Sequence, residues 1–216
     1  MHVNDEQGSN YWAVEDFWSG IHKQSLSDKK ILGWDFWSLI PSGTKQGSQY
    51  FTVTLFPCLQ AMMETATSWD AIATAKKAYP KMTEKELNAM MENTVKSHDV
   101  ANQVFIKEID KTKDDFEMKP GIMATMDIMK QLDDSYEKIE SEVFKPWHQQ
   151  MVKEGKKGNW DLLQVILPAG SKAYGTHLTV SMFRDAAQIA AFMEGGVGTI
   201  NFTTQTAVNQ GLKTRD

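Results

Sequence analysis

The chain has little of several features that would mark a specialised class of protein. It has one cysteine, Cys58, in 216 residues, so neither an intrachain disulfide nor a multi-cysteine metal site can form. No apolar run approaches the roughly 18 residues that a membrane-spanning helix needs. The first ten residues have neither the basic start nor the apolar stretch of a signal peptide. We therefore expect neither membrane insertion nor a signal peptide in this sequence.

Clustered positive charge is also missing. The formal net charge is −5 and lysine and arginine are not gathered in one segment, which argues against a nucleic-acid partner or an anionic membrane surface. Neither a phosphate-binding loop, nor a dinucleotide fingerprint, nor a Gly-x-Ser-x-Gly nucleophile motif is present. With 41% hydrophobic and 24% charged residues, the composition is typical of a globular protein, with room for one large domain or two of about 100 residues.

The strongest signal in the sequence is an internal repeat. When the chain is shifted by 126 residues, and by 127 after one inserted residue before Pro168, twelve residues between 22 and 56 meet identical residues between 148 and 183. Average composition predicts roughly two such identities by chance. The first-copy members are His22, Gln24, Lys30, Trp34, Asp35, Ile40, Pro41, Gly43, Lys45, Thr52, Val53 and Phe56. The sequence therefore predicts a duplicated structural unit.

Each copy predicts a helix, a two-stranded hairpin and a second helix. Spaced apolar residues among charges indicate amphipathic helices over 9–28 and 132–154, with a kink or a late start at Pro146. The β-rich runs 30–40 and 48–56, and their counterparts 159–167 and 176–183, indicate hairpins with turns at Pro-Ser-Gly and Pro-Ala-Gly. Helical stretches follow at 58–78 and 185–194. Another helix is expected from Thr83, which has capping-box spacing with Glu86.

A strand is expected before each first helix and after each last one. The segment 121–129 fits ahead of the second copy, whereas its first-copy equivalent falls mostly before residue 1. The segment 104–110 fits a closing strand of the first copy, with a helix as the alternative. The predicted domains are therefore 1–112, with its first strand largely missing, and 120–216, with its last strand missing. A polar linker around 111–120 joins them.

The order strand–helix–strand–strand–helix–strand is that of a ferredoxin-like unit. With the run from the helix through "GW", "PSGT" and "YFTVTLF", the chain resembles the dimeric α/β-barrel superfamily, which includes antibiotic-biosynthesis monooxygenases and haem-degrading relatives. The stretch "FKPWHQQMVKEGKKGNWDLLQVILPAGS" is similar to uncharacterised exported bacterial proteins with two tandem units. The resemblance implies an α+β fold of tandem ferredoxin-like units, in which two antiparallel sheets face each other as a barrel with the helices outside. It also implies an exported or periplasmic location, and it transfers architecture better than chemistry.

The alternation of the third strand predicts a ligand site. If Phe51, Val53 and Leu55 pack under the helices, the intervening polar residues point between the two sheets. An interior lined with hydroxyls and aromatic rings suits a small amphipathic or aromatic molecule. The alternative is that these groups satisfy one another, since a barrel of this size can be filled by side chains. The predicted ligand-binding residues are Trp34, Ser38, Tyr50, Thr52, Trp160, Gln164, His177 and Thr179.

The candidates for a catalytic role are His22, His148 and His177. His22 and His148 occupy matching positions, each four residues after an aromatic residue, which places both rings on one helix face. Histidine titrates near neutral pH and serves as a general base or metal ligand; the alternative is a hydrogen-bonding residue near the helix end. Because no Cys, Asp or Glu stands at helical ligand spacing in both copies, neither a metal nor another cofactor is predicted.

Three kinds of function fit these features. The first is a small-molecule binding protein that holds a partly apolar ligand between its two sheets. The second is a cofactor-independent monooxygenase-like enzyme acting on an aromatic substrate. The third is a scaffold that acts by association alone. A homo-oligomer is compatible with each of them.

Overall fold

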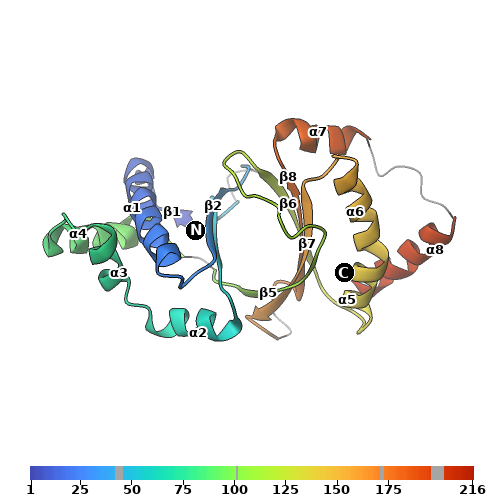
Figure 1. Cartoon of the computed structure of the whole chain (residues 1–216), viewed down its shortest axis with the longest axis horizontal. Helices are drawn as coiled ribbons and strands as arrows, with labels where there is room; N and C mark the ends of the chain where they lie inside the picture. Colours follow the sequence, from blue (N-terminus) through green and yellow to red (C-terminus); the bar gives the residue numbers. More distant parts are fainter. Residues whose placement is uncertain (42–45, 101, 171–172, 196–201) are drawn as a thin grey trace. The chain divides into compact units, whose positions relative to one another are not determined.

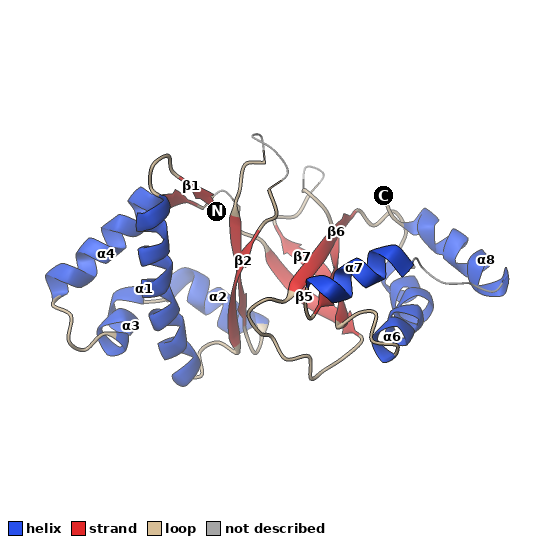
Figure 2. Cartoon of the chain, turned by 90° about the horizontal axis from the view of Figure 1, so that it is seen from above, coloured by secondary structure: helices blue, strands red, loops and turns tan. Residues whose placement is uncertain are grey.

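The computed structural model describes residues 1–41, 46–100, 102–170, 173–195 and 202–216. The chain is α+β and divides into two compact units, residues 1–103 and 104–216, whose helices and strands are drawn in Figures 1 and 2. Across these ranges we find no helix with the length and apolar composition needed to cross a membrane. The expected Pro-Ser-Gly turn lies outside the described residues, because these omit 42–45.

The first unit contains the predicted hairpin and helices, except that the helical stretch expected over 58–78 is two helices, which are separated at Trp69 and Asp70. Its elements are β1 (His2–Val3), α1 (Gly8–Ser27), β2 (Gly33–Ser38), β3 (Tyr50–Leu55), α2 (Leu59–Ser68), α3 (Ala71–Ala78), α4 (Glu84–Ser97) and β4 (His98–Asp99). β2 and β3 form an antiparallel hairpin. β1 pairs with β4, so the segment after the last helix lies beside the segment before the first one. Phe17, Ile21, Ala75 and Leu87 form the buried core between α1, α3 and α4.

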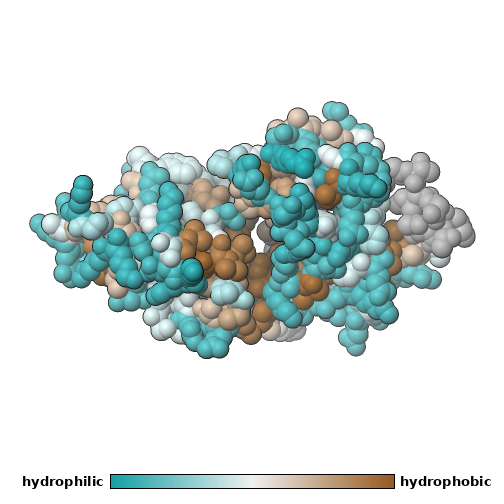
Figure 3. Space-filling model, viewed as in Figure 1, coloured by the Kyte–Doolittle hydropathy of each residue, from teal (hydrophilic) through white to brown (hydrophobic). Residues whose placement is uncertain are grey.

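The second unit is built on one four-stranded antiparallel sheet in the order β5-β7-β8-β6. Its strands are β5 (Phe105–Lys111), β6 (Met123–Met129), β7 (Asn159–Leu167) and β8 (His177–Phe183). Its helices are α5 (Tyr136–Ile139), a π-helical turn (Glu140–Phe144), α6 (Lys145–Lys153), α7 (Ala186–Gly195), α8 (Phe202–Gly211) and a short 3₁₀ turn (Leu212–Thr214). Past that turn, Arg215 bridges to Gln131 in antiparallel fashion, next to the end of β6. In Figure 3, hydrophilic residues cover most of the helices and apolar residues gather nearer the strands.

The sequence predicts a kink or a late helix start at Pro146, and in the structure a π-helical turn interrupts the α-helix just before this residue. Pro146 stands in the first turn of α6, directly after the π-helical turn. Proline has no N–H and its ring collides with the carbonyl four residues earlier, so it kinks or breaks a regular α-helix. The wider π-helical turn absorbs this mismatch. It also carries Glu140 and Phe144, both of which are buried.

Residues 104–110 form a strand, but not in the unit where the sequence places it. β5 pairs antiparallel with β7, with Lys107 opposite Gln164, and so belongs to the second compact unit. The units divide between residues 103 and 104 rather than at the linker expected around 111–120. The sequence misleads here because alternation identifies a strand without identifying its partner.

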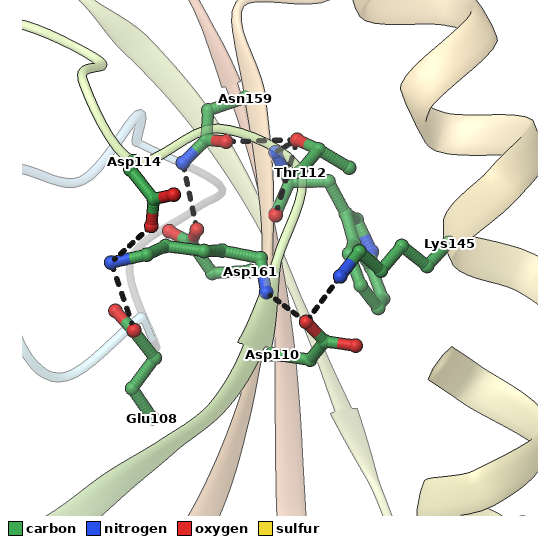
Figure 4. A network of polar contacts seen from close by, with 9 residues as sticks. Glu108, Asp110, Thr112, Asp114, Lys145, Asn159 and Asp161 are labelled. Atoms are coloured by element: carbon green, nitrogen blue, oxygen red, sulfur yellow. Dashed lines mark hydrogen bonds and ion pairs between the residues drawn. The ribbon is translucent and has the colours of Figure 1, made fainter. Parts of the chain in front are cut away.

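Polar contacts hold this edge of the sheet together (Figure 4). Lys145 of α6 donates to Asp110 of β5 at 2.5 Å. The Thr112 hydroxyl, just after β5, donates to Asn159 Oδ1 at 2.8 Å, and Asn159 Nδ2 in turn donates to Asp161 at 2.7 Å. These contacts join β5 to both α6 and β7.

The polar face of the second sheet lies under the helices, which reverses the prediction from the sequence. Ser181 pairs with Trp160 and Thr179 with Leu162, so these side chains share one face. His148 of α6 stacks on Trp160, so the face that carries Thr179 is the one that α6 covers. Val180 lies on the opposite face.

The first unit shows the same reversal. Tyr50 stacks on Tyr11 of α1 with ring centroids 4.9 Å apart, so alternation places Thr52 on the helix face and Val53 away from it. The prediction that Thr52 and Thr179 point away from the helices is therefore wrong. Alternation assigns faces correctly only when the helices bring apolar side chains to the sheet. In the second unit they also bring polar ones, such as Glu137 of α5, which bonds to His177.

We expect the capping box of α4 to stabilise the first unit measurably. The Thr83 hydroxyl accepts from the Glu86 N–H while the Glu86 carboxylate accepts from the Thr83 N–H. Thr83→Ala should lower the free energy of unfolding by about 1 kcal/mol. The control is Thr67→Ala, because the Thr67 hydroxyl bonds only to carbonyls within α2; it should change stability by less than about 0.5 kcal/mol. Equal effects in urea melts would contradict this assignment.

Candidate functional site

Each unit stacks a helix histidine on a strand tryptophan. In the first unit His22 of α1 lies on Trp34 of β2, with ring centroids 4.7 Å apart and planes 14° apart. In the second, His148 of α6 lies on Trp160 of β7 at 4.6 Å and 12°. Burial lowers the pKa of His22 to about 4. Burial, together with the charges of Lys157 and Arg215, lowers that of His148 to about 2. Both rings are therefore neutral at physiological pH.

Beneath the helices of the second unit lies a cavity of about 180 Å³. The strands supply its floor, and the π-helical turn and α6 supply its roof. The rings of three aromatic residues, one imidazole and two hydroxyls line it together with charged groups. The lining residues are Asp127, Met129, Glu140, Phe144, Trp147, His148, Trp160, Thr179, Ser181 and Arg215.

A buried lysine stands behind the cavity wall. The Lys157 side chain is 1% exposed, and its Nζ lies 2.9 Å from His148 Nδ1 and 2.8 Å from Ser181 Oγ. Its charge also lies over aromatic rings, 4.9 Å from the centroid of Phe192 and 5.7 Å from that of Trp147. Burial lowers the pKa of Lys157 to about 8, against a smaller opposing effect of the Asp127 charge. The amine is therefore mostly protonated at neutral pH and becomes neutral in mild alkali.

A buried ion pair forms another part of the wall. Glu140 accepts from the guanidinium of Arg215, whose carbon lies 4.4 Å from the centroid of the Phe144 ring. Burial raises the pKa of Glu140, while Arg215 opposes that shift. Because the Glu140 carboxylate and the Arg215 guanidinium are hydrogen-bonded and neutralise each other, neither is free to balance a further charge.

The sequence repeat provides an internal comparison for these groups. Glu140 aligns with Val14 and Lys157 with Ile31 in the first copy. Val14 and Ile31 are buried apolar core residues. A buried charge lowers stability by several kcal/mol unless it is well compensated. The second unit therefore carries ionisable groups at positions where the first shows that apolar residues suffice.

The structure gathers some of the residues predicted from the sequence and separates others. His148, Trp160 and Thr179 all line the cavity. His177 and Gln164 do not: they meet at Glu137, which lies 3.0 Å from His177 Nε2 and 3.2 Å from Gln164 Nε2. His177 is thus held by structural hydrogen bonds under α5.

The remaining predicted residues belong to the first unit. Trp34 and His22 stack on each other, and Tyr50 stacks on Phe36 with centroids 5.2 Å apart. Ser38 ends β2 opposite Tyr50, and both Ser38 and Thr52 are exposed. None of these residues lines the cavity of the second unit.

Reasoning from the sequence missed the charged members of the site. Lys157, Glu140 and Arg215 were not among its candidates, although two of them stand opposite apolar residues in the repeat alignment. That mismatch was the available signal. Within the described ranges no cluster of three or more His, Cys, Asp and Glu side chains could hold a metal ion.

We expect the two copies to respond oppositely to exchange of the aligned residues Lys157 and Ile31. Ile31→Lys should lower the free energy of unfolding by about 3 kcal/mol or more, because it buries an ammonium among apolar groups. Lys157→Ile should leave stability unchanged or raise it, because it removes a buried charge. Urea denaturation of both variants tests this. A large loss in Lys157→Ile would show that the lysine is a structural requirement.

The neutral His148 ring should make the protein sensitive to acid. The folded pKa is about 2, whereas an unfolded chain takes up the proton near pH 6.5. Below that pH the unfolded state binds more protons, so stability falls on acidification by at most about 1.4 kcal/mol per pH unit for each such group. Between about pH 7.5 and pH 5, His148→Phe should therefore lose roughly 1–2 kcal/mol less than the parent protein.

His22→Phe should behave in the same direction over a narrower range, since its folded pKa is about 4. Thermal unfolding followed at several pH values gives both comparisons. Parallel stability curves for the parent and both variants would show that neither ring is held neutral.

Comparison with known proteins finds a similarity of fold but no similarity of sequence to a protein family or a curated protein. No protein-family model matches the sequence, and no curated protein does either. A solved structure, that of a putative monooxygenase from Fusobacterium nucleatum, aligns with 100% of this chain and 84% of that chain, at a TM-score of 0.52 and 11% identity. The chain is therefore an α+β protein with a fold similar to that of this structure.

Proposed function

We propose that the protein binds a small, partly apolar molecule in the cavity of the second unit, between the sheet and the helices. The observation that carries the proposal is the contrast between the units: ionisable side chains surround this cavity where the aligned first-unit positions 14 and 31 are apolar core. Stability alone does not account for such groups, and functional sites are where proteins accept this loss. The proposed ligand site thus lies beneath the helices rather than between two sheets.

The size of the cavity limits the ligand. Its volume of about 180 Å³ is below the range of about 300–1,000 Å³ that is usual for drug-sized ligands. It is close to that of engineered cavities of about 150 Å³ that take up benzene. The rings of Phe144, Trp147 and Trp160 provide apolar walls. A compound with a single aromatic ring fits these dimensions.

The tandem arrangement is part of the proposal. The matching His–Trp stacks at 4.7 and 4.6 Å support two copies of one unit. The last residues of each unit support it as well, because they pair with a segment that precedes the unit's first helix: His98 pairs with Val3, and Arg215 pairs with Gln131. Each sheet also keeps apolar residues on the face turned away from its own helices, among them Phe51 and Leu178. A barrel of two facing sheets, as in the superfamily that the sequence resembles, would cover such faces.

The second candidate function is oxygenation of an aromatic substrate without a cofactor. It is favoured by the likeness of fold to the Fusobacterium nucleatum protein and by the stacked rings around the cavity. A fold hosts many activities, so this likeness carries less weight than the cavity itself. Oxygen uptake with an electron-rich phenol, abolished by filling the cavity, would establish an enzyme. Binding without oxygen uptake would establish a binding protein.

Filling the cavity should weaken binding. Thr179 faces the cavity and is nearly buried, so Thr179→Leu should occupy the ligand's space and reduce affinity at least about tenfold. Thr52 aligns with Thr179 in the first unit and is exposed, so Thr52→Leu is the matched control and should bind normally. Calorimetry with a panel of single-ring compounds, including phenol, benzamide and benzoate, provides the measurement.

Two results would contradict the proposal. One is the absence of binding by every compound of the panel to the parent protein, which would favour a scaffold. The other is equal loss of affinity in Thr52→Leu and Thr179→Leu, which would place the site elsewhere. Melting temperatures of both variants show whether the fold is retained.

A further inference from the structure

The ammonium of Lys157 has no carboxylate within ion-pair distance among the described residues. Its two hydrogen-bond partners are a neutral imidazole and a hydroxyl. Among the described residues, the carboxylate that acts on its charge is that of Asp127, which attracts it from farther away; Glu140 is occupied by Arg215. In a site of low dielectric constant such an unbalanced charge interacts strongly with any anion that enters.

Hydrogen-bond chemistry then fixes what the cavity wall offers a ligand. An ammonium only donates, so Lys157 requires both His148 Nδ1 and Ser181 Oγ to accept. The proton of the neutral His148 ring must therefore sit on Nε2, and the Ser181 hydroxyl keeps its own proton for another partner. The Thr179 hydroxyl also has no hydrogen bond among the described residues. Since His148, Ser181 and Thr179 line the cavity, its polar part is rich in hydrogen-bond donors.

Resting on the proposed function, we infer that the cavity takes a single-ring aromatic compound carrying an anionic oxygen group, such as a carboxylate. The ring lies among the aromatic walls. The oxygen group accepts from the hydroxyls of Ser181 and Thr179, and Lys157 behind them supplies the positive charge. The cavity thus offers an apolar part to the ring and a donor-rich, positively charged part to the anionic oxygen group of the same ligand.

The carboxylate of Asp127, which also lines the cavity and has no ion-pair partner among the described residues, opposes this arrangement. It is exposed, unlike Lys157, so water screens it more effectively. The field inside the cavity is therefore dominated by the buried cation. Asp127 also provides a test of sign, because removing its charge should strengthen the binding of an anion.

The experiment compares benzoate with benzamide, which has nearly the same shape and no charge. Calorimetry at neutral pH should show the parent protein binding benzoate at least about tenfold more tightly than benzamide. Lys157→Met should remove that preference and change benzamide affinity less than about threefold. Lys156→Met is the matched control, since Lys156 lies partly exposed beside Glu154; it should keep the preference. Asp127→Asn should increase benzoate affinity alone.

The outcomes separate this inference from the proposed function. Binding of benzamide with no preference for benzoate, or an unchanged preference in Lys157→Met, overturns the inference and leaves the cavity a binding site. Binding of neither compound overturns both. Should Lys157→Met fail to fold, Asp127→Asn decides: unchanged or weaker benzoate binding in this variant overturns the inference.

Discussion

The stack of His148 on Trp160 sets the geometry on which the second unit depends. Two flat rings in contact hold α6 at a fixed distance above β7, and the π-helical turn before Pro146 offsets the start of that helix. With the helix held this far from the sheet, the shorter Thr179 and Ser181 side chains cannot fill the space, and a cavity results. The first unit has the same stack between His22 and Trp34, but buries apolar residues around it.

Besides their different numbers of strands, the units differ in the chemistry around this stack. Around one common stack, the first unit uses Val14 and Ile31, and the second uses Glu140 and Lys157. Close-packed apolar side chains stabilise a core, whereas buried charges reduce stability unless a partner compensates them. Glu140 finds that partner in Arg215. The hydrogen-bond partners of Lys157 among the described residues are neutral acceptors, which makes it the group of the site most open to a ligand.

The similarity of fold to a solved structure does not by itself identify the activity of this protein. At 11% identity, the similarity to the Fusobacterium nucleatum structure concerns the backbone alone, and one backbone supports many activities. The particular side chains around the cavity decide between binding and catalysis. Trp147, Trp160 and Phe144 favour an aromatic ligand, while the buried amine and hydroxyls favour an oxygen acceptor.

The sequence by itself determined the local structure: the amphipathic helices, both hairpins, the capping box at Thr83 and the break at Pro146. Each follows from contacts or steric limits within a few residues, which periodicity and residue type record directly. It also placed His148, Trp160 and Thr179 among the candidates. Only the tertiary structure decided which sheet face the helices cover, that β5 pairs with β7, and that Lys157 is buried. These depend on partners distant in sequence, and alternation cannot name the partner.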